Sequence, residues 1–504
     1  MSPTGSRVPG SVRPGGPTLL VALLAGGAGV AGSYAVAGFT PDFVAGQVAG
    51  FTARAMPSAV VSFAIVVLGD LGHQINLVAA LALSAFALGV VALAGLVLAA
   101  RMETPLLAPV ATTVGCALLA FAVTRAPLAS GVAGLAAAFV TAVWSLWPSG
   151  DGTTVSTARR RLLGSATSAL VAGIAGFALG SRGDPHGETV DADVGIGEGP
   201  AVQMPVSSLL AEARRKSLDV DGLEPLVSTD FYEVDINATN PALDADEWSL
   251  RVTGAVEQEI SYDYDELREL EPENMFHTLR CVGESLNGNK LDNAVWTGVP
   301  VTRLVEPAGV SPECCVMLRA ADGYFEQFPR EVFENALLAY GMNGEALPRQ
   351  HGFPARAVVP GHWGEISVKW ITEIEVIDRP VEGYWERRGW EGTGPVNTVA
   401  KLYVDNRLDD GRVEVAGHAY AGVRGIEQVE VSTDGGETWD RATLSDPLPG
   451  EAVWRQWVYR YEPPADAHEV VVRATDGTGT LQPRDRANAF PSGATGWVST
   501  ELEP

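Results

Sequence analysis

The sequence contains little lysine and little cysteine, with four residues of each among 504. The cysteines do not suit a disulfide framework, because Cys116 lies in an apolar segment and Cys314 and Cys315 are adjacent. A CxxCH motif is missing, as are the cysteine spacings of an iron–sulfur cluster. The apolar first part has a single histidine, His73, so it lacks the histidine pair that a b-type haem needs. We therefore expect no haem and no iron–sulfur cluster in this chain.

Positive charge is scarce too. The chain carries 61 acidic against 35 basic residues, a net charge of −26. Residues 1–182 hold only four of the acids and nine of the basic residues, so the rest of the chain has a net charge of about −31. Acids spread over a whole domain are typical of a solvated surface suited to high salt and indicate a halophilic protein; the alternative is an ordinary acidic protein. Either surface repels nucleic acid, which we exclude as a partner.

Apolar runs long enough to cross a membrane as helices fill the N-terminal part. They occupy residues 17–38, 51–71, 75–100, 105–124, 126–147 and 161–180. Six spans are expected; five is the alternative, because Asp70, His73 and Asn76 crowd the end of the second run. Small residues permit close helix contacts, and polar groups are nearly missing. We predict an anchor or packing bundle, since no residue supports the alternative of a transport or quinone role.

Arginines at the ends of these runs indicate an orientation in the cell membrane. With six spans, five arginines fall on one side and three on the other: Arg54, Arg101, Arg159, Arg160 and Arg161 against Arg7, Arg13 and Arg125. Arginines favour the cytoplasmic side, so the soluble part of this multi-pass protein is predicted to be extracytoplasmic. The letters ARRRLL at residues 158–163 also resemble a twin-arginine export signal, and a cytoplasmic helix end with three arginines explains them equally well.

After the last run the character of the chain changes. Residues 181–205 are rich in Gly, Asp and Glu without periodicity and indicate an extended linker, with soluble structure from about Thr229. Residues 248–253 alternate like a strand and residues 263–270 resemble a short helix, which favours an α+β domain. From residue 396 the pattern is all-β and predicts a small sandwich. Its strands are expected at residues 413–415, 428–431, 454–461 and 469–474.

The stretch HTLRCVGESLNGNKLDNAVWTGVPV at residues 277–301 carries the chemistry. It places Cys281 at the end of an alternating run, before a loop rich in Gly and Asn. A thiolate at a strand end, followed by backbone that can approach a ligand closely, suits a metal site better than a packing site.

Several segments resemble the sulfite oxidase family of molybdopterin-dependent oxidoreductases. The resemblance lies in FYEVDINATNPALDADEWSLRVTG, HTLRCVG with WTGVPV, and ADGYFEQFPREVFENALLAYGMNGEALPRQHGFPARAVVPGHWGEISVKW. GHAYAGVRGIEQVEVSTDGGETWDRATL and VWRQWVYRYEPPADAHEVVVRATDGTGTLQP resemble the family's immunoglobulin-like dimerisation domain. The implied fold class is α+β in four parts. These are a transmembrane helical bundle (1–181), an acidic, Gly-rich linker (182–225), a mixed α/β molybdopterin domain (226–392) and an immunoglobulin-like β-sandwich (393–504).

The resemblance implies a molybdenum–molybdopterin cofactor, with Cys281 as the thiolate ligand of the metal. Tyr324 corresponds to the active-site tyrosine of the family; without the resemblance it would be a rim residue. Arg424 matches an arginine that, in this family, points from the second domain towards the substrate, where a cation binds an oxyanion. The alternative interpretation of Arg424 is a solvated turn residue. Cys314 and Cys315 are instead interpreted as small apolar core residues.

Four further side chains match the segments that hold the pterin and its phosphate: His351, Arg356, Ser367 and Lys369. Arginine suits a forked phosphate contact, lysine a point charge and serine a hydroxyl bond. The alternative for all four is a surface position on loops.

Two departures from the family leave the substrate open. Sulfite oxidases carry arginines shortly after the metal-binding cysteine, where this chain has Glu284, Ser285 and Leu286. They also carry an arginine near the start of the domain, where this chain has residues 233–237, EVDIN. A pocket that lacks two cations and gains acids is expected to bind sulfite less well. The segment NATNPALDADEW resembles the family's bacterial sulfoxide-reductase branch, which lacks the second domain.

The resemblance covers the chain from about Thr229 to its end and implies an enzyme that transfers an oxygen atom to or from a small substrate, in the manner of a sulfite oxidase. The apolar N-terminal part lies outside the resemblance and is expected to anchor this enzyme in the membrane. A sulfoxide reductase of the same family is the first alternative, and a non-enzymatic surface protein on a degenerate scaffold is the second. Electrons are expected to pass to an external carrier, either a cytochrome, a blue-copper protein or a quinone-linked partner. A homodimer through the C-terminal domain is also implied.

Overall fold

The computed structural model describes residues 14–147, 157–181, 204–310 and 315–503. These residues form two compact units. The first contains most of the helices before residue 181 together with residues 236–242; the second contains residues 57–69 and the rest. Arg7, Arg13, Cys314 and most of the predicted linker, residues 182–203, lie outside the described residues.

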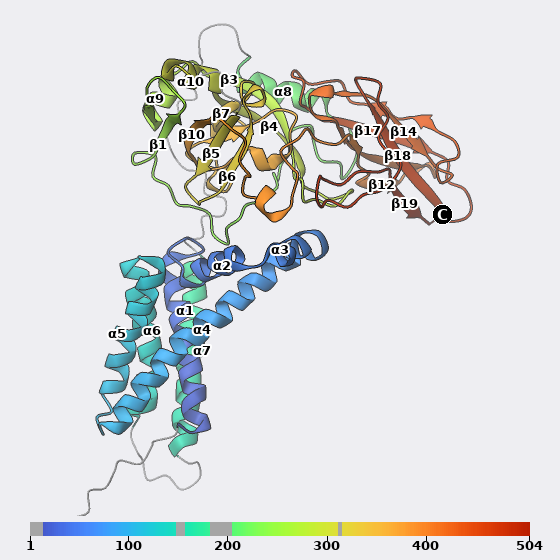
Figure 1. The fold of residues 1–504 in the computed structure, drawn as a ribbon. Helices are drawn as coiled ribbons and strands as arrows, with labels where there is room; N and C mark the ends of the chain where they lie inside the picture. Colours follow the sequence, from blue (N-terminus) through green and yellow to red (C-terminus); the bar gives the residue numbers. More distant parts are fainter. Residues whose placement is uncertain (1–13, 148–156, 182–203, 311–314, 504) are drawn as a thin grey trace, which may run out of the picture. The chain divides into compact units, whose positions relative to one another are not determined.

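The first unit is a bundle of apolar helices (Figure 1). Its helices are α1 (Gly16–Ala37), α2 (Val44–Ala55), α4 (Asp70–Arg101), α5 (Leu107–Thr124), α6 (Pro127–Leu146) and α7 (Thr157–Gly180). Five helices among the described residues are long and apolar enough to cross a membrane. The packing is close because glycines face backbone: a Cβ on Gly26 would lie 1.9 Å from the carbonyl oxygen of Ala85, and one on Gly134 would lie 2.4 Å from that of Thr113.

The second apolar run does not form a straight helix. It divides into α2 and the pair α3 (Ser58–Phe63) and η1 (Ala64–Leu68), and α2 and this pair are bent by 111° at their break. Pro57 at the break lacks the amide hydrogen that a continuous helix needs. If the bent pair counts as one span, the total rises from five to six, so both predicted counts remain. Asn76 is not a stray polar residue, because its side-chain amide bonds to the carbonyl of Ala49 at 3.0 Å and its oxygen accepts from Thr52 at 2.8 Å.

Two sheets form the first part of the second unit. One has the order β2-β1-β10-β5-β6 and the other β3-β4-β7-β8, with β9 on β7. The strands are β1 (Ser249–Gly254), β2 (Ile260–Asp263), β3 (Glu273–Arg280), β4 (Leu291–Pro300), β5 (Cys315–Ala320), β6 (Phe325–Pro329), β7 (Leu337–Met342), β8 (Glu345–Ala346), β9 (Arg356–Val358) and β10 (Ile371–Ile377). Strand β1 lies parallel to β10 and so joins the start of this domain to its end.

Short helices and apolar side chains complete this mixed α/β domain. Helix α9 (Tyr264–Glu269) falls within the predicted range of residues 263–270. It begins at Tyr264 because Asp263 and Glu266 cap its first turn reciprocally. A continuous core of large side chains such as Trp296 and Phe328 fills the space between the sheets. Around it lie α10 (Val301–Val305), η2 (Glu306–Ala308), α11 (Arg330–Phe333), η3 (Arg349–His351), η4 (Gly364–Ile366) and η5 (Glu386–Arg388).

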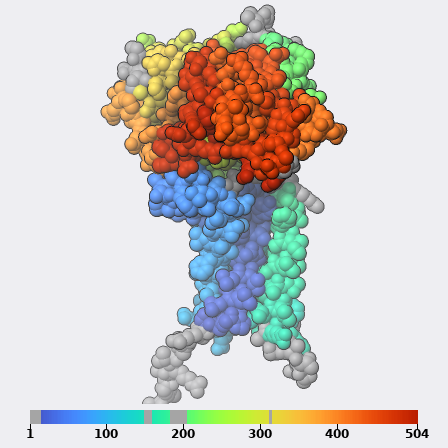
Figure 2. Space-filling model, turned by 90° about the vertical axis from the view of Figure 1, so that its right-hand side faces the viewer, coloured from blue at the N-terminus to red at the C-terminus, as the bar shows by residue number. Residues whose placement is uncertain are grey.

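The C-terminal part is a sandwich of two sheets, as the alternating runs predict. One sheet has the order β11-β13-β17-β16 with β12 on β13, and the other β15-β14-β18-β19. Its elements are β11 (Val399–Ala400), β12 (Val404–Arg407), β13 (Val413–Tyr420), η6 (Gly422–Arg424), β14 (Ile426–Ser432), β15 (Asp440–Arg441), β16 (Thr443–Leu444), β17 (Arg455–Tyr461), β18 (His468–Asp476) and β19 (Val498–Leu502). Trp457, Val429 and Val472 share one core between the sheets. Figure 2 shows the outer surface of these strands in orange and red.

Two features differ from the sequence-based expectations. Helix α8 (Val206–Lys216) lies inside the segment that we predicted to be a linker. It is stable there because Val206, Leu209 and Ala213 form an apolar stripe that packs into the core of the second unit. Ordered structure therefore begins before Thr229. Cys315 is buried at the start of β5, as expected for a core residue, but it is disulfide-bonded and so is not the free thiol that we predicted.

Candidate functional site

Cys281 follows directly after the last residue of β3, so the predicted position at a strand end is correct. Its amide donates to the carbonyl of Lys290 at 3.0 Å, which closes residues 282–289 into a tight loop before β4. The thiol is free and half-buried. Burial raises the pKa of Cys281 to about 11; Lys290 acts against this shift, and the nearby carboxyl groups of Glu284 and Glu365 add to it. At neutral pH the thiol therefore keeps its proton.

The four residues predicted to hold the cofactor come together in the structure. The amide of Ala357 donates to the carbonyl of Val368 at 2.9 Å, which joins the HGFPAR segment to the SVKW segment. Across this junction Arg356 donates to the carbonyls of His351 at 3.1 Å and Ser367 at 3.0 Å. His351, Arg356 and Ser367 are all buried, so they are not the exposed loop residues of the alternative interpretation.

Lys369 lies beside this group. Its ammonium donates to Asp235 at 3.1 Å and to the carbonyl of Gln350 at 2.9 Å. Asp235 belongs to the EVDIN segment that departs from the sulfite oxidase pattern. Burial lowers the pKa of Lys369 and, together with the charges of Arg356 and Lys369, lowers the pKa of His351 to about 3. The imidazole is therefore neutral, and the two cations are the positive charges of this pocket.

Tyr232 connects the cofactor group to Cys281, and our sequence analysis did not single it out. Its ring stacks on that of Phe231 with 5.4 Å between the ring centroids, and Phe231 meets the ring of His351 edge-on at 5.4 Å. Burial raises the pKa of the Tyr232 phenol; the charge of Cys281 raises it further and that of Arg356 lowers it. A Cβ on Gly364 would lie 2.9 Å from the Tyr232 hydroxyl and 3.3 Å from the carbonyl oxygen of Arg280. The turn η4 thus packs closely against the end of β3. Tyr232 is part of the quoted FYEVDINATN segment, which is the only signal that the sequence offered.

Tyr324 lies against carboxyl groups. Its hydroxyl donates to Glu326 at 3.1 Å and to the backbone carbonyl of Glu365 at 3.0 Å. Glu326, Glu365 and Glu386 offer carboxylate oxygens that all lie within 4.8 Å of one another, and we call this set the carboxyl trio. The carboxyl oxygens of Glu365 and Glu386 are buried without a hydrogen-bond partner. The trio was not predicted, because its members come from β6, η4 and η5.

Within the carboxyl trio, Glu365 holds its proton at neutral pH. Burial, with the neighbouring carboxyl Glu386, raises the pKa of Glu365 to about 9 and the pKa of Glu326 well above its usual value. Burial and the charges of the trio also raise the pKa of Tyr324, so its phenol stays protonated. This side of the site therefore offers hydrogen-bond donors and no positive charge.

Arg424 in η6 is engaged within the second domain. Its guanidinium donates to Asp476 at 2.9 Å, to the carbonyl of Val396 at 2.9 Å and to the hydroxyl of Thr398 at 3.1 Å. Burial acts to raise the pKa of Asp476, but hydrogen bonds from Thr478 and Arg424 outweigh it and hold the pKa at about 2. The arginine is about one quarter exposed, so it is not the fully solvated turn residue of the alternative interpretation.

Glu284 does not add free negative charge to the pocket. It is buried and pairs with Arg280 at 2.7 Å and with Lys401 at 2.6 Å. The acid that replaces the family's cation after Cys281 is thus neutralised by two buried bases. Sequence comparison alone could not show this, because Lys401 lies 117 residues away from Glu284.

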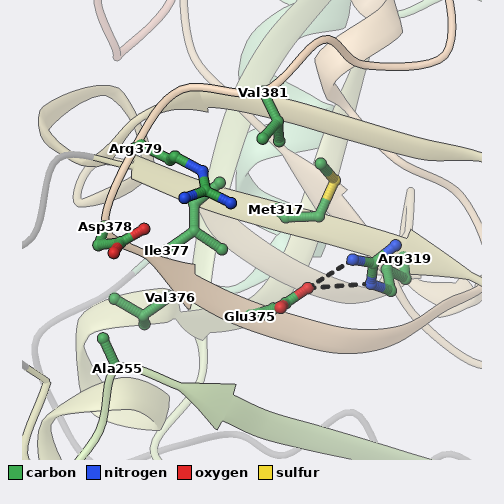
Figure 3. Close-up of a pocket in the computed structure, with 9 residues that line it drawn as sticks. All are labelled: Ala255, Met317, Arg319, Glu375, Val376, Ile377, Asp378, Arg379 and Val381. Carbon is green, nitrogen blue, oxygen red and sulfur yellow. Dashed lines mark hydrogen bonds and ion pairs between the residues drawn. The ribbon is translucent and has the colours of Figure 1, made fainter.

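A pocket of about 440 Å³ lies apart from these residues (Figure 3). Its walls come mainly from β5 and β10, and Figure 3 shows Arg319 bonded to Glu375 across it. None of the predicted site residues lines it, so we do not assign the proposed chemistry to this pocket.

Comparisons with known proteins agree with this arrangement. The family described as "Oxidoreductase molybdopterin binding domain" matches residues 237–385, and the one described as "Mo-co oxidoreductase dimerisation domain" matches residues 396–492. The chain is 34% identical over 154 residues to "Uncharacterized oxidoreductase YuiH" of Bacillus subtilis, covering 30% of this chain and 76% of that protein. The chain belongs to the family of molybdopterin-binding oxidoreductases.

Sulfite oxidases are among its relatives. The mitochondrial sulfite oxidase of Mus musculus is 29% identical over 297 residues, which are 48% of this chain and 54% of that protein. The sulfite oxidase of Arabidopsis thaliana is 27% identical over 367 residues, which are 57% of this chain and 93% of that protein. The chain thus spans about half the length of the mammalian relatives that it matches. Among solved structures, the sulfane dehydrogenase SoxCD from Paracoccus pantotrophus aligns with a TM-score of 0.48 at 21% identity, covering 63% of this chain and 93% of that chain.

The residues around Cys281 fit a molybdopterin group by their chemistry. A soft sulfur donor suits a metal that its own cofactor also binds through sulfur. Arg356 and Lys369 are cations in a buried pocket and suit an anionic phosphate. Tyr232 is an aromatic residue with a polar tip, and its hydroxyl lies against the turn that also contacts Arg280, the residue before Cys281.

Proposed function

We propose that this protein is a membrane-anchored molybdenum enzyme that transfers an oxygen atom between water and a small substrate. The observation that carries the proposal is that the free thiol Cys281 and the buried Arg356 are linked by a chain of packing contacts. Gly364 lies against the hydroxyl of Tyr232 and the carbonyl of Arg280, and Phe231, next to Tyr232, contacts the ring of His351, whose carbonyl accepts from Arg356. In the oxidising direction the substrate gains an oxygen atom from water, and two protons and two electrons are released. The bound cofactor supplies the two-electron chemistry, and the protein supplies ligand, orientation and proton acceptors.

Each side chain has a distinct role in this proposal. Cys281 binds the metal as a thiolate. Arg356 and Lys369 hold the phosphate, while His351 and Ser367 complete the pterin pocket. Tyr324 donates a hydrogen bond to the substrate oxygen, and the neighbouring Glu365, protonated at neutral pH, supplies a proton in the reducing direction.

The electrons leave or enter through an external carrier. The sequence has no haem or iron–sulfur motif that could store them. We propose a cytochrome, a blue-copper protein or a quinone-linked partner in this role. A homodimer through the C-terminal domain is part of the same proposal, since that domain matches a dimerisation family.

We propose that the helical unit crosses a cell membrane and leaves the second unit outside the cytoplasm. The five helices α1, α4, α5, α6 and α7 are long and apolar enough for this. With five spans, six arginines fall on one side and two on the other: Arg7, Arg13, Arg101, Arg159, Arg160 and Arg161 against Arg54 and Arg125. The larger group favours the cytoplasm, so five spans support the same location as six spans for the catalytic part. A reporter fused after residue 504 tests it, and a cytoplasmic signal would contradict it.

A second candidate function is the reduction of a sulfoxide, and the charges of the site favour it. Three candidate cations are already engaged: Arg280, next to Cys281 in the chain, by Glu284, Lys369 by Asp235 and Arg424 by Asp476. The side of Tyr324 carries the carboxyl trio, whose protonated Glu365 can donate to the oxygen of an uncharged sulfoxide. This site offers an oxyanion such as sulfite few free positive charges, whereas it offers hydrogen-bond donors to an uncharged substrate.

Metal analysis tests the central claim. Full-length protein from a host that makes the molybdenum cofactor is expected to hold molybdenum and pterin in equal amounts. Cys281→Ser should lower the molybdenum content strongly, whereas the matched control Cys116→Ser, a buried free thiol in α5, should not. Wild-type protein without molybdenum would contradict the proposal and favour a non-enzymatic surface role. Initial rates with sulfite and with methionine sulfoxide then separate the two directions, and inactivity on both would remove both substrates.

A further inference from the structure

Three charged side chains, those of Arg280, Glu284 and Lys401, form a buried group next to the loop that follows Cys281. The side chains of Arg280 and Lys401 are 0% exposed and that of Glu284 is 1% exposed. Glu284 accepts from the Nε of Arg280 at 2.7 Å through one carboxylate oxygen and from the ammonium of Lys401 at 2.6 Å through the other. We call these three residues the buried charge triad. Because such charges are costly to bury, each depends on the others.

The triad joins the loop of the metal ligand to the second domain. Arg280 precedes Cys281, and Glu284 lies within the loop that follows it, where its carboxylate also accepts from the amide of Lys290 at 3.0 Å. Lys401 belongs to the C-terminal domain, between β11 and β12, and donates a further bond to the carbonyl of Gly288 at 2.6 Å.

Further bonds fix the same loop to the same segment. The side chain of Asn287 donates to the carbonyl of Leu402 at 2.7 Å and accepts from its amide at 2.9 Å. The hydroxyl of Tyr403 donates to the carbonyl of Gly288 at 2.7 Å. The segment of the second domain is itself rigid, because the amide of Lys401 donates to His418 at 2.8 Å and its carbonyl accepts from Trp457 at 3.0 Å. The hydrogen bonds from the second domain therefore restrict the conformation of the loop that follows Cys281.

We propose that Lys401 is a positioning residue for Cys281: it acts through Glu284, so the C-terminal domain is part of the metal site as well as a dimerisation module. The proposal rests on the proposed role of Cys281 as the metal ligand. Partners that orient a metal ligand without touching the metal commonly change its affinity or activity about 10- to 100-fold when they are removed. The sequence replaces the family's cations after Cys281 with Glu284, and Lys401 returns a positive charge to this position from the other domain.

Charge-matched variants separate positioning from packing. Lys401→Met leaves Glu284 with a single base, and Glu284→Gln leaves two bases without an acid. The double variant Lys401→Met/Glu284→Gln removes one charge of each sign and should recover most of the melting temperature lost in the single variants. The matched control is Arg473→Met, which breaks a partly buried ion pair with Glu430 inside the second domain.

Two readouts decide the question, and only one requires the metal. Hydrogen exchange of residues 281–290 should become faster in Lys401→Met and in the double variant, but not in Arg473→Met. In metal-loaded protein, the Mo(V) electron paramagnetic resonance spectrum should shift in the same two variants, with kcat lowered about 10-fold or more. Unchanged exchange in Lys401→Met would overturn the proposal even in a protein without molybdenum. Unchanged spectra at equal metal content would overturn it as well, while leaving the proposed function intact.

Discussion

The hydroxyl of Tyr324 donates a hydrogen bond to Glu326 at 3.1 Å. Glu326 belongs to the carboxyl trio, and among the described residues no basic residue is bonded to these three carboxyl groups. A phenol in such surroundings is a proton donor that cannot ionise easily, because burial and the neighbouring carboxyl groups all raise its pKa. The nearest cations face aromatic rings instead: Arg387 lies over Phe325 at 4.6 Å and Arg388 over Tyr384 at 3.7 Å. The substrate side of the site is therefore rich in protons and poor in positive charge.

Glu365→Gln is expected to flatten the dependence of stability on pH. Burial and Glu386 raise the pKa of Glu365 from 4.5 to about 9, so the folded state keeps a proton that the unfolded state has lost between these values. The contribution of Glu365 to the free energy of unfolding should then be most favourable below pH 4.5 and fall as the pH rises towards 9. Thermal unfolding from pH 5 to 9 measures this. The exposed Glu382→Gln, in the segment between β10 and η5, is the control, and an equal slope in Glu365→Gln and wild type would contradict the assignment.

Tyr324→Phe is expected to lower kcat and to cost about 1–3 kcal/mol of stability, because it removes one of the donors to the buried Glu326, which then keeps the amide of Gln327. Tyr324→Phe/Glu326→Gln should recover the stability and not the rate. Chemical denaturation and steady-state kinetics on the same preparations measure both quantities. A rate that returns together with stability would show that Tyr324 acts only through packing.

Gly364→Ala should disturb the proposed metal site through Tyr232 and Arg280, which lie next to the glycine. The new methyl group would lie 2.9 Å from the hydroxyl of Tyr232 and 3.3 Å from the carbonyl oxygen of Arg280, so one of them must move. We expect a loss of about 1–3 kcal/mol and a lower molybdenum content. Tyr232→Phe removes the closer of the two atoms, and the double variant should be more stable than Gly364→Ala alone. Additive effects in this double-mutant cycle would rule out the contact as the cause.

Arg424→Met separates two roles of that arginine. Asp476, with a pKa held at about 2 partly by Arg424, stabilises the folded state above its usual pKa of 3.8, and this contribution is lost as the pH falls towards 2. The stability difference between wild type and Arg424→Met should thus be constant above about pH 4 and narrow below it. Urea unfolding at several pH values tests this role. If Arg424 also binds the substrate, KM for an anionic substrate rises in the variant, whereas KM for an uncharged one does not.

Local pattern was sufficient for most of the architecture. Alternation predicted β3 and hence the position of Cys281 after its last residue, and the same rule found β13, β14, β17 and β18. Hydrophobic length predicted helices at five of the six apolar runs. It could not foresee the break at Pro57 as a 111° bend, since a run of apolar residues carries no information on the angle between its halves. Helix α8 was missed because its apolar stripe is only eleven residues long and follows a polar stretch.

The sequence by itself determined the family and predicts Cys281 as the metal ligand, because both depend on residues that are neighbours along the chain. Only the tertiary structure decided which charges meet. Glu284 looks like an added acid in the sequence, yet Lys401, 117 residues away, neutralises it together with Arg280. The carboxyl trio around Tyr324 likewise comes from three separate segments. Coulomb interactions and burial depend on distance in space, and the fold sets that distance independently of separation along the chain.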